Sequence, residues 1–379
     1  MVVWADIPSD LLNSISNRFD IVSRLRLSTV CTSWASAIRC DLPALPSFHP
    51  DQPVPWLFLR VEPSTSNPDH SDFSFYDLNT TTLDCIPSPI PYPLVYGARW
   101  LGSNNGWLAF ISQQHQLHLI SPLTGAHLLL PLIKLPDGFQ GVLAYYWGND
   151  SKVAWNTCMK VILCQEPDHS SVSHSGLLVL ALFWPHGLAV WKECGDKWTW
   201  LNLKTHYNDA IVYDGKIYAV GHEVLHWWEV TGSSFRAWNI LPISTTMPKL
   251  HANYLVQVGG KLLMICRNRE WGGCGHRMSV YELNFYPNGI FWRHVESIGN
   301  HTMFLGKGYS SIASTIGLDG AQGNCIYYVD DDYFYCKIDV QPRSSFNDSG
   351  VQNLKKNTYE KISLDNSPPA TWFWPCAVK

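Results

Sequence analysis

The sequence predicts a mainly β chain, in which a small N-terminal helical module precedes a β-propeller of about six blades (five to seven). Three observations predict this class. Helical apolar spacing is confined to the first 40 residues, and helix patterns are nearly absent afterwards. A Gly-containing turn followed by short apolar strands then returns several times along the chain. Two of these copies open at Gly215 and Gly260, a separation within the roughly 40–50 residues of a propeller blade.

Residues 1–40 are predicted to form short amphipathic helices. Pro8 suits the first position of a helix, where its missing N–H costs nothing. The first apolar stripe consists of Leu11, Leu12, Ile15 and Phe19, and the second of Leu27, Val30, Cys31, Trp34 and Ile38. Because so small a unit lacks the volume to bury both stripes, some of this apolar surface must contact the rest of the chain or another protein.

Ile-Pro-x-Asp-Leu-Leu at residues 7–12, followed by Leu-x-x-Val-Cys-x-x-Trp at residues 27–34, resembles the F-box. The F-box is the segment by which substrate receptors of SCF-type ubiquitin ligases bind a Skp-family adaptor. The resemblance covers roughly residues 3–40 and implies a set of adaptor-binding residues: Ile7, Pro8, Leu11, Leu12, Ile15, Phe19, Leu27, Val30, Cys31 and Trp34. The alternative is a helical hairpin that only caps the body of the chain.

Composition limits the class of function and the compartment. The net charge is −4 and charged residues make up 15% of the chain. The sequence therefore shows no basic face of the kind that binds nucleic acid. The count of eleven cysteines is odd, and their spacing shows no disulfide framework. The N-terminus lacks a signal peptide, and the most apolar run, 177–191, is too short to span a bilayer. We therefore expect a soluble protein of the cytoplasm and/or nucleus that binds neither nucleic acid nor membrane.

A proline-rich segment separates the module from the body. Residues 41–55 contain five prolines, at positions 43, 46, 50, 53 and 55, which indicates a stiff linker. The body then spans residues 56–379, and its clearest turn–strand copies open near residues 105, 214, 259 and 323. Units of this kind cannot bury both faces alone, so they stack radially on one another. A two-layer sandwich would not explain the repeat spacing.

Several body segments are similar to those of plant F-box proteins with a kelch-like propeller domain of uncharacterised function. They are Gly102–Leu108, Leu117–Gly125, Tyr254–Val256 with Gly259-Gly260, Phe304–Gly306, Asn324–Tyr327, and Pro368-Pro369 before Trp372. The resemblance implies a kelch-like propeller over residues 56–379 and the role of a substrate receptor.

No motif in the chain indicates catalysis, and we expect no catalytic residue, resident metal or cofactor. No G-x-S-x-G elbow, P-loop, Rossmann fingerprint or H-E-x-x-H is present. Asp330–Asp332 are interpreted as a solvated turn, and Cys266, Cys274 and His276 lack the paired spacing of a zinc site. His115 and His118 have no evident carboxylate partner, while Cys158 and Cys164 are expected to pack as small apolar residues.

The segment 267–277 is the best candidate for binding a target protein. It interrupts a predicted blade, and its glycines would let it project from a rigid frame. Trp and Arg are enriched among interface hot spots. The candidate residues are Arg267, Arg269, Trp271 and Arg277. The alternative is an ordinary long hairpin.

Together these features predict a non-catalytic substrate receptor of an SCF-type ubiquitin ligase. Its expected partners are a Skp-family adaptor, a cullin reached through that adaptor, and a target protein of unknown identity. Two alternatives are a propeller scaffold outside any ligase and an enzyme that acts on a small molecule in the propeller mouth.

Overall fold

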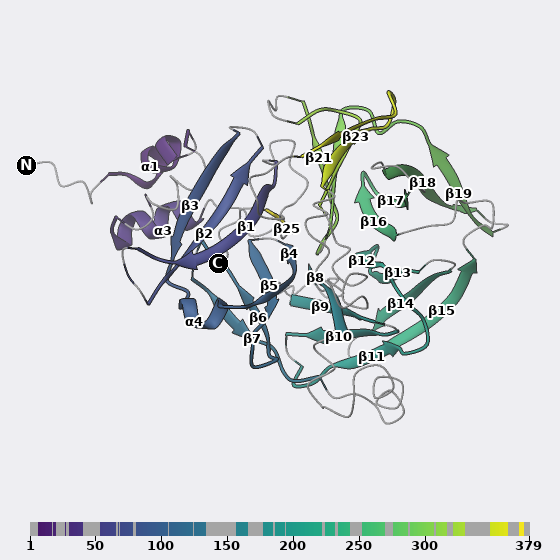
Figure 1. Ribbon diagram of the computed structural model, residues 1–379, viewed down its shortest axis with the longest axis horizontal. Coiled ribbons are helices and arrows are strands. Elements are labelled where there is room, and N and C mark those ends of the chain that lie inside the picture. The colour runs from purple at the N-terminus through teal and green to yellow at the C-terminus, as the bar shows by residue number, and fades with distance from the viewer. Residues whose placement is uncertain are drawn as a thin grey trace, which may run out of the picture.

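The structure is a computed structural model that describes most of the chain. The described residues are 7–16, 18–19, 27, 30–40, 54–65, 67, 69–78, 81–104, 106–123, 125–133, 157–165, 177–184, 186–193, 195–221, 224–231, 234–242, 252–269, 276–286, 289–306, 308–316, 321–329, 349–362 and 371–374. Their strands form six sheets arranged around a central axis (Figure 1). The predicted β-propeller is therefore confirmed, and its six blades match the expected number.

Two helices of the N-terminal module precede the propeller: α1 (Ser9–Ser16) and α3 (Thr32–Cys40). The predicted linker lies almost wholly outside the described residues, and the first strand begins at Trp56. Blade 1 contains β1 (Trp56–Pro63), β2 (Ser71–Asp77), β3 (Thr82–Ser88) and, as its innermost strand, β25 (Thr371–Phe373). The one-turn helix α4 (Tyr92–Val95) follows β3.

Blades 2 to 5 are regular four-stranded antiparallel sheets. Blade 2 contains β4 (Arg99–Asn104), β5 (Trp107–Ile111), β6 (Leu117–Ile120) and β7 (His127–Leu129). Blade 3 contains β8 (Cys158–Gln165), β9 (Leu177–Phe183), β10 (Leu188–Lys192) and β11 (Thr199–Asn202). Blade 4 contains β12 (Asp209–Tyr213), β13 (Lys216–Val220), β14 (Val224–Thr231) and β15 (Ser234–Pro242). Blade 5 contains β16 (Ala252–Val258), β17 (Lys261–Arg269), β18 (His276–Tyr286) and β19 (Gly289–Val295).

Blade 6 departs from this regular pattern. It contains β20 (His301–Leu305), β21 (Ser311–Ser314), β22 (Cys325–Tyr328), β23 (Gly350–Asn353) and β24 (Thr358–Lys361). The sheet order places β20 between β21 and β22, and β20 runs parallel to β22. The next strand, β25, joins blade 1, where Trp56 faces Phe373 in an antiparallel pair. The pairing of β25 with β1 closes the ring.

The turns follow the local chemistry of the sequence. Asp214 and Gly215, which join β12 to β13, both have positive φ angles, of 47° and 71°. This is the backbone of a type I′ hairpin turn, for which Asp-Gly is a preferred pair. The predicted turn–strand copy at residues 214–220 is thus confirmed.

The core consists of six apolar clusters, one in each seam between neighbouring blades. Strand β9 shows how the sequence supplies them, because side chains alternate between the two faces of a strand. Val179, Ala181 and Phe183 pack in the seam with blade 2. The residues between them, Leu178, Leu180 and Leu182, pack in the seam with blade 4.

The N-terminal module has a small core of its own. Leu12 and Trp34 are buried against each other, and the partly buried Ile7, Leu27, Cys31 and Ala37 surround them. Helix α1 starts directly after Pro8, whose carbonyl accepts the N–H of Leu11 at 3.1 Å and that of Leu12 at 3.0 Å. Among the described residues, no helix is long and apolar enough to cross a membrane.

The thiols of the propeller core are buried. Cys158 and Cys164 are free and buried in β8, as the sequence predicted, and Cys266 is free and buried in β17. Burial raises the pKa of each of these three thiols to about 12.

Adjacent leucines of α1 should differ in their effect on the stability of the module. Leu12→Ala leaves a cavity beside Trp34 and should cost about 2–5 kcal/mol, whereas Leu11, which is 56% exposed, leaves none. We expect hydrogen exchange in peptides from α1 and α3 to accelerate strongly in Leu12→Ala and little in Leu11→Ala. Equal acceleration in both variants would contradict the assignment of Leu12 to the core.

Because its core thiols are buried, the protein should lose free energy of unfolding at alkaline pH. The folded chain holds their protons more tightly than the unfolded chain, because their pKa lies at about 12 instead of 9.0. Their contribution to the free energy of unfolding is therefore retained below a pH of about 9 and is lost as the pH rises toward 12. Urea unfolding at increasing pH would measure this loss.

Mass-spectrometric thiol labelling at neutral pH gives an independent measurement. It should modify the exposed Cys85 before Cys158, Cys164 and Cys266. Early labelling of the three core thiols would contradict their burial.

Candidate functional site

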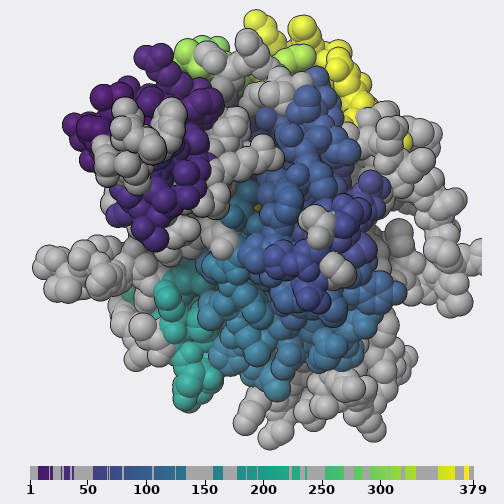
Figure 2. Space-filling model, turned by 90° about the vertical axis from the view of Figure 1, so that its left-hand side faces the viewer, coloured from purple at the N-terminus to yellow at the C-terminus, as the bar shows by residue number. Residues whose placement is uncertain are grey.

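The N-terminal module presents an exposed apolar face. Four of the ten large apolar side chains that the described residues leave exposed belong to it: Leu11, Ile15, Phe19 and Val30. We call these four residues the module face. Leu11 and Ile15 are four residues apart on α1, so they lie on one side of the helix. Figure 2 shows the module, in purple, on the surface of the molecule beside the blue strands of the first blades.

The structure separates the predicted adaptor-binding residues into two groups. The side chains of the module face are exposed, and Pro8 is exposed at the start of α1. Leu12 and Trp34 instead form the internal core, and Ile7, Leu27 and Cys31 are partly buried around them. Leu12 is only 2% exposed, so it holds the two helices together and orients the module face.

Leu11 and Leu12 belong to one apolar stripe in the sequence but have different roles in the structure. Successive residues of a helix are rotated by about 100°, and α3 covers only part of the apolar side of α1. Leu12 points at Trp34, whereas Leu11 lies on the uncovered part. The module face is therefore exposed for contact with another protein, whereas Leu12 and Trp34 are not.

The predicted target-binding segment is shorter than expected. Pairing of β17 with β18 continues to Arg269 and His276, so residues 270–275 connect the strands. The expectation that Arg267 is an exposed loop residue is wrong, because its side chain is fully buried. Its Nη1 donates to the Tyr254 hydroxyl at 3.3 Å, and its guanidinium lies 4.8 Å from the centre of the Tyr328 ring.

Of the other candidate residues in this segment, the structure describes the side chain of Arg277. Arg277 is exposed at the start of β18, where it is paired with Asn268. Trp271 and the side chain of Arg269 lie outside the described residues. Cys274, the side chain of His276 and Asp330–Asp332 lie outside them as well.

The histidines considered as ligands or bases occupy a strand pair in blade 2. His118 is buried on β6, stacks on Phe110, and places its Nδ1 at 2.9 Å from Nε2 of His127. Burial, together with the nearby His127, lowers the pKa of His118 to about 4. The pair is therefore neutral near pH 7. His115 lies in the turn before β6 with a positive φ of 60°.

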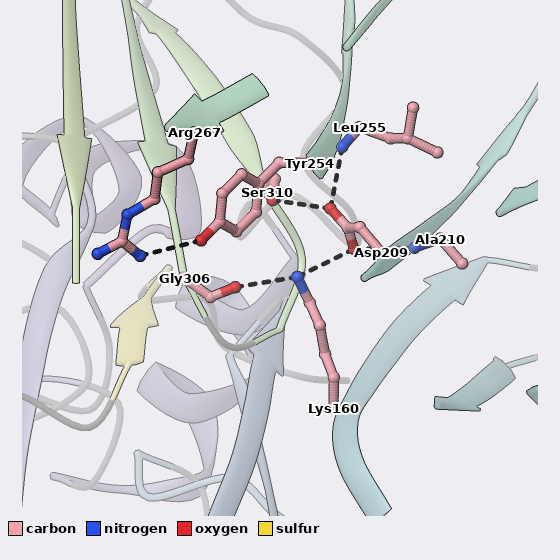
Figure 3. A network of polar contacts seen from close by, with 8 residues as sticks. All are labelled: Lys160, Asp209, Ala210, Tyr254, Leu255, Arg267, Gly306 and Ser310. Carbon is pink, nitrogen blue, oxygen red and sulfur yellow. Dashed lines mark hydrogen bonds and ion pairs between the residues drawn. The ribbon is translucent and has the colours of Figure 1, made fainter. Parts of the chain in front are cut away.

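A second polar site lies at the propeller axis, and sequence reasoning missed it. Lys160 on β8 and Asp209 on β12 form an ion pair of 2.9 Å, with side chains only 7% and 1% exposed (Figure 3). Asp209 also accepts the backbone N–H of Leu255 at 3.0 Å and the hydroxyl of Ser310 at 3.2 Å. A lone lysine within the apolar strand Cys158–Cys164 was the available signal, because a buried charge requires a partner.

Comparison with known proteins agrees with both parts of this architecture. The model of the F-box domain matches residues 4–42, and the model of the KIB1-4 beta-propeller matches residues 75–353. Three relatives from Arabidopsis thaliana match along most of their length. F-box/kelch-repeat protein At1g57790 is 24% identical over 98% of this chain and 96% of its own. Putative F-box protein At4g22660 is 23% identical over 86% of each chain.

The third relative, F-box protein KIB4, is 21% identical over 97% of this chain and 94% of its own. The match to this relative covers 97% of this chain, so it includes both the module and the propeller. The propeller match alone covers more than half of the sequence. The chain therefore belongs to the KIB1-4 β-propeller family and carries an F-box domain at its N-terminus.

Proposed function

We propose that this protein is a substrate receptor of an SCF-type ubiquitin ligase. Its F-box module binds a Skp-family adaptor and, through that adaptor, a cullin. Its propeller holds a target protein. The observation that supports this assignment best is the module face, in which Leu11, Ile15, Phe19 and Val30 stay exposed although the module has a core of its own.

The module face has the character of a binding surface. A fully buried Leu, Ile, Val or Phe side chain contributes about 1.5–3 kcal/mol relative to an exposed one, and these four are only partly exposed. Their combined burial against a partner still offsets part of the entropy cost of association. A few such anchors dominate a typical interface, which buries about 1,600 Å² in total.

In this role the protein acts by proximity and performs no covalent chemistry. The receptor holds a target near the ligase subunits that carry ubiquitin. This converts a bimolecular encounter into an effectively intramolecular one. The proposal places the protein in the cytoplasm and/or nucleus. The six cysteines whose side chains the structure describes are free, which suits a reducing compartment.

Placing charges on the module face should abolish adaptor binding without unfolding the protein. We expect Leu11→Asp/Ile15→Asp to lose co-purification with a Skp-family adaptor, because two carboxylates would then have to be desolvated in the interface. The matched control is Leu83→Asp, since Leu83 is 57% exposed on β3 of the propeller. This control should bind like the natural chain. Pull-down and calorimetric titration with the purified adaptor measure the difference.

Two outcomes of this experiment would contradict the proposal. One is unchanged adaptor binding by the double variant. The other is absence of binding by the natural chain, which would favour a propeller scaffold whose helical module serves only as a cap. Circular dichroism of each variant tests whether the propeller remains folded.

A further inference from the structure

Residues 306 and 308–310 lie at the axis of the propeller. This segment, which we call the axial strap, joins β20 to β21 in blade 6, and the structure describes Gly306, Gly308, Tyr309 and Ser310 of it. Its hydrogen bonds to Lys160, Asp209 and Ser103 join it to blades 3, 4 and 2, and blade 3 is opposite blade 6 in a ring of six. A connection between two adjacent strands thus reaches across the centre of the molecule.

The Lys160–Asp209 ion pair fastens both ends of the strap (Figure 3). Lys160 Nζ donates to the carbonyl oxygen of Gly306 at 2.9 Å, at the beginning of the strap. Asp209 Oδ2 accepts the Ser310 hydroxyl at 3.2 Å, at its end. Because the pair is almost completely buried, its polar groups depend on these hydrogen bonds for satisfaction.

The middle of the strap lies against β4 of blade 2. The N–H of Tyr309 donates to the carbonyl of Ser103 at 3.3 Å. A Cβ atom added at Gly102 would lie 2.8 Å from the Cα of Gly308, so the two backbones touch. Gly308 has a φ of 99°, a conformation that other residues rarely adopt, and the strap can follow this path only with glycine there.

The closing strand β25 is hydrogen-bonded to residues next to the strap. The indole N–H of Trp372 donates to the carbonyl of Leu305, the residue directly before the strap, at 2.9 Å. The Ser103 hydroxyl donates to the carbonyl of Trp372, while the carbonyl of Ser103 holds Tyr309. The strap, β4 and β25 therefore share one set of hydrogen bonds.

We propose that the Lys160–Asp209 pair locks the axial strap and that the locked strap is the seat on which β25 closes the ring. The pair and the closing strand are linked through the strap, although they lie in different blades. Release of the lock should therefore loosen the C-terminal strand while the outer strands of blade 1 remain paired.

Hydrogen exchange on the full chain tests this coupling. In Lys160→Met/Asp209→Leu the pair is replaced by apolar side chains, so no uncompensated buried charge remains and the propeller should stay folded. We expect peptides covering residues 301–314 and 371–374 to exchange on the order of tenfold faster, and peptides from β2 and β3 to be unchanged. Ser310→Ala, which removes a single anchor, should accelerate the same peptides to a smaller extent.

The matched control breaks an ion pair whose lysine is exposed and whose carboxylate, Glu282, keeps a second partner in Arg293. Lys261 Nζ lies 3.2 Å from Glu282, with the lysine side chain 55% exposed, so Lys261→Met should leave both regions unchanged. The proposal is overturned if residues 371–374 keep their natural exchange rate while the strap accelerates. It is also overturned if every blade accelerates equally, or if Lys261→Met has the same effect.

Discussion

Each blade of this propeller has two apolar faces, and the rest of the structure depends on burying both. Strand β9 shows the constraint most plainly, because its alternate residues fill two different seams. A sheet of this kind cannot be stable at the end of a row, so the blades are joined in a ring in which every blade has two neighbours. Closure of the ring through the pairing of β25 with β1 follows from this requirement. The blades bury both of their faces against each other, whereas the small module leaves four large apolar side chains exposed.

Hydrogen bonds between neighbouring blades add to the apolar seams. Around the axis, inner strands of neighbouring blades exchange hydrogen bonds, such as that from Asn104 Nδ2 to the carbonyl of Leu163 at 2.7 Å. Asn253, on the inner strand β16 of blade 5, donates its Nδ2 to the carbonyl of Gly221, directly after β13 of blade 4, again at 2.7 Å. The seams supply most of the apolar burial, and these directional bonds fix how the blades are placed around the centre. The axis, where an enzyme of propeller shape could hold a small molecule, is crossed here by the axial strap.

Local chemistry explains why much of the fold could be predicted from the sequence. Turns such as Asp214-Gly215 and alternating strands depend on neighbouring residues, so their signals are readable in a single sequence. The expected resemblance to plant F-box propeller proteins is confirmed by the family matches. The pairing of strands that are distant in the chain could not be predicted from the sequence. The position of β20 between β21 and β22 depends on strands that are not adjacent in the chain, and the burial of Arg267 depends on how far β17 pairs with β18. The different environments of Leu11 and Leu12 depend on where α3 lies, and the predicted adaptor contacts remain predictions.

The position of β25 in the chain also has a consequence during protein synthesis. Strand β1 ends at Pro63, but its inner partner begins at Thr371, after all the other blades have left the ribosome. Until then the inner edge of β1 presents unpaired backbone groups, a template for strand addition by another polypeptide. Chaperone protection of the nascent chain is most valuable in this interval, because partly folded β proteins with open edges aggregate readily.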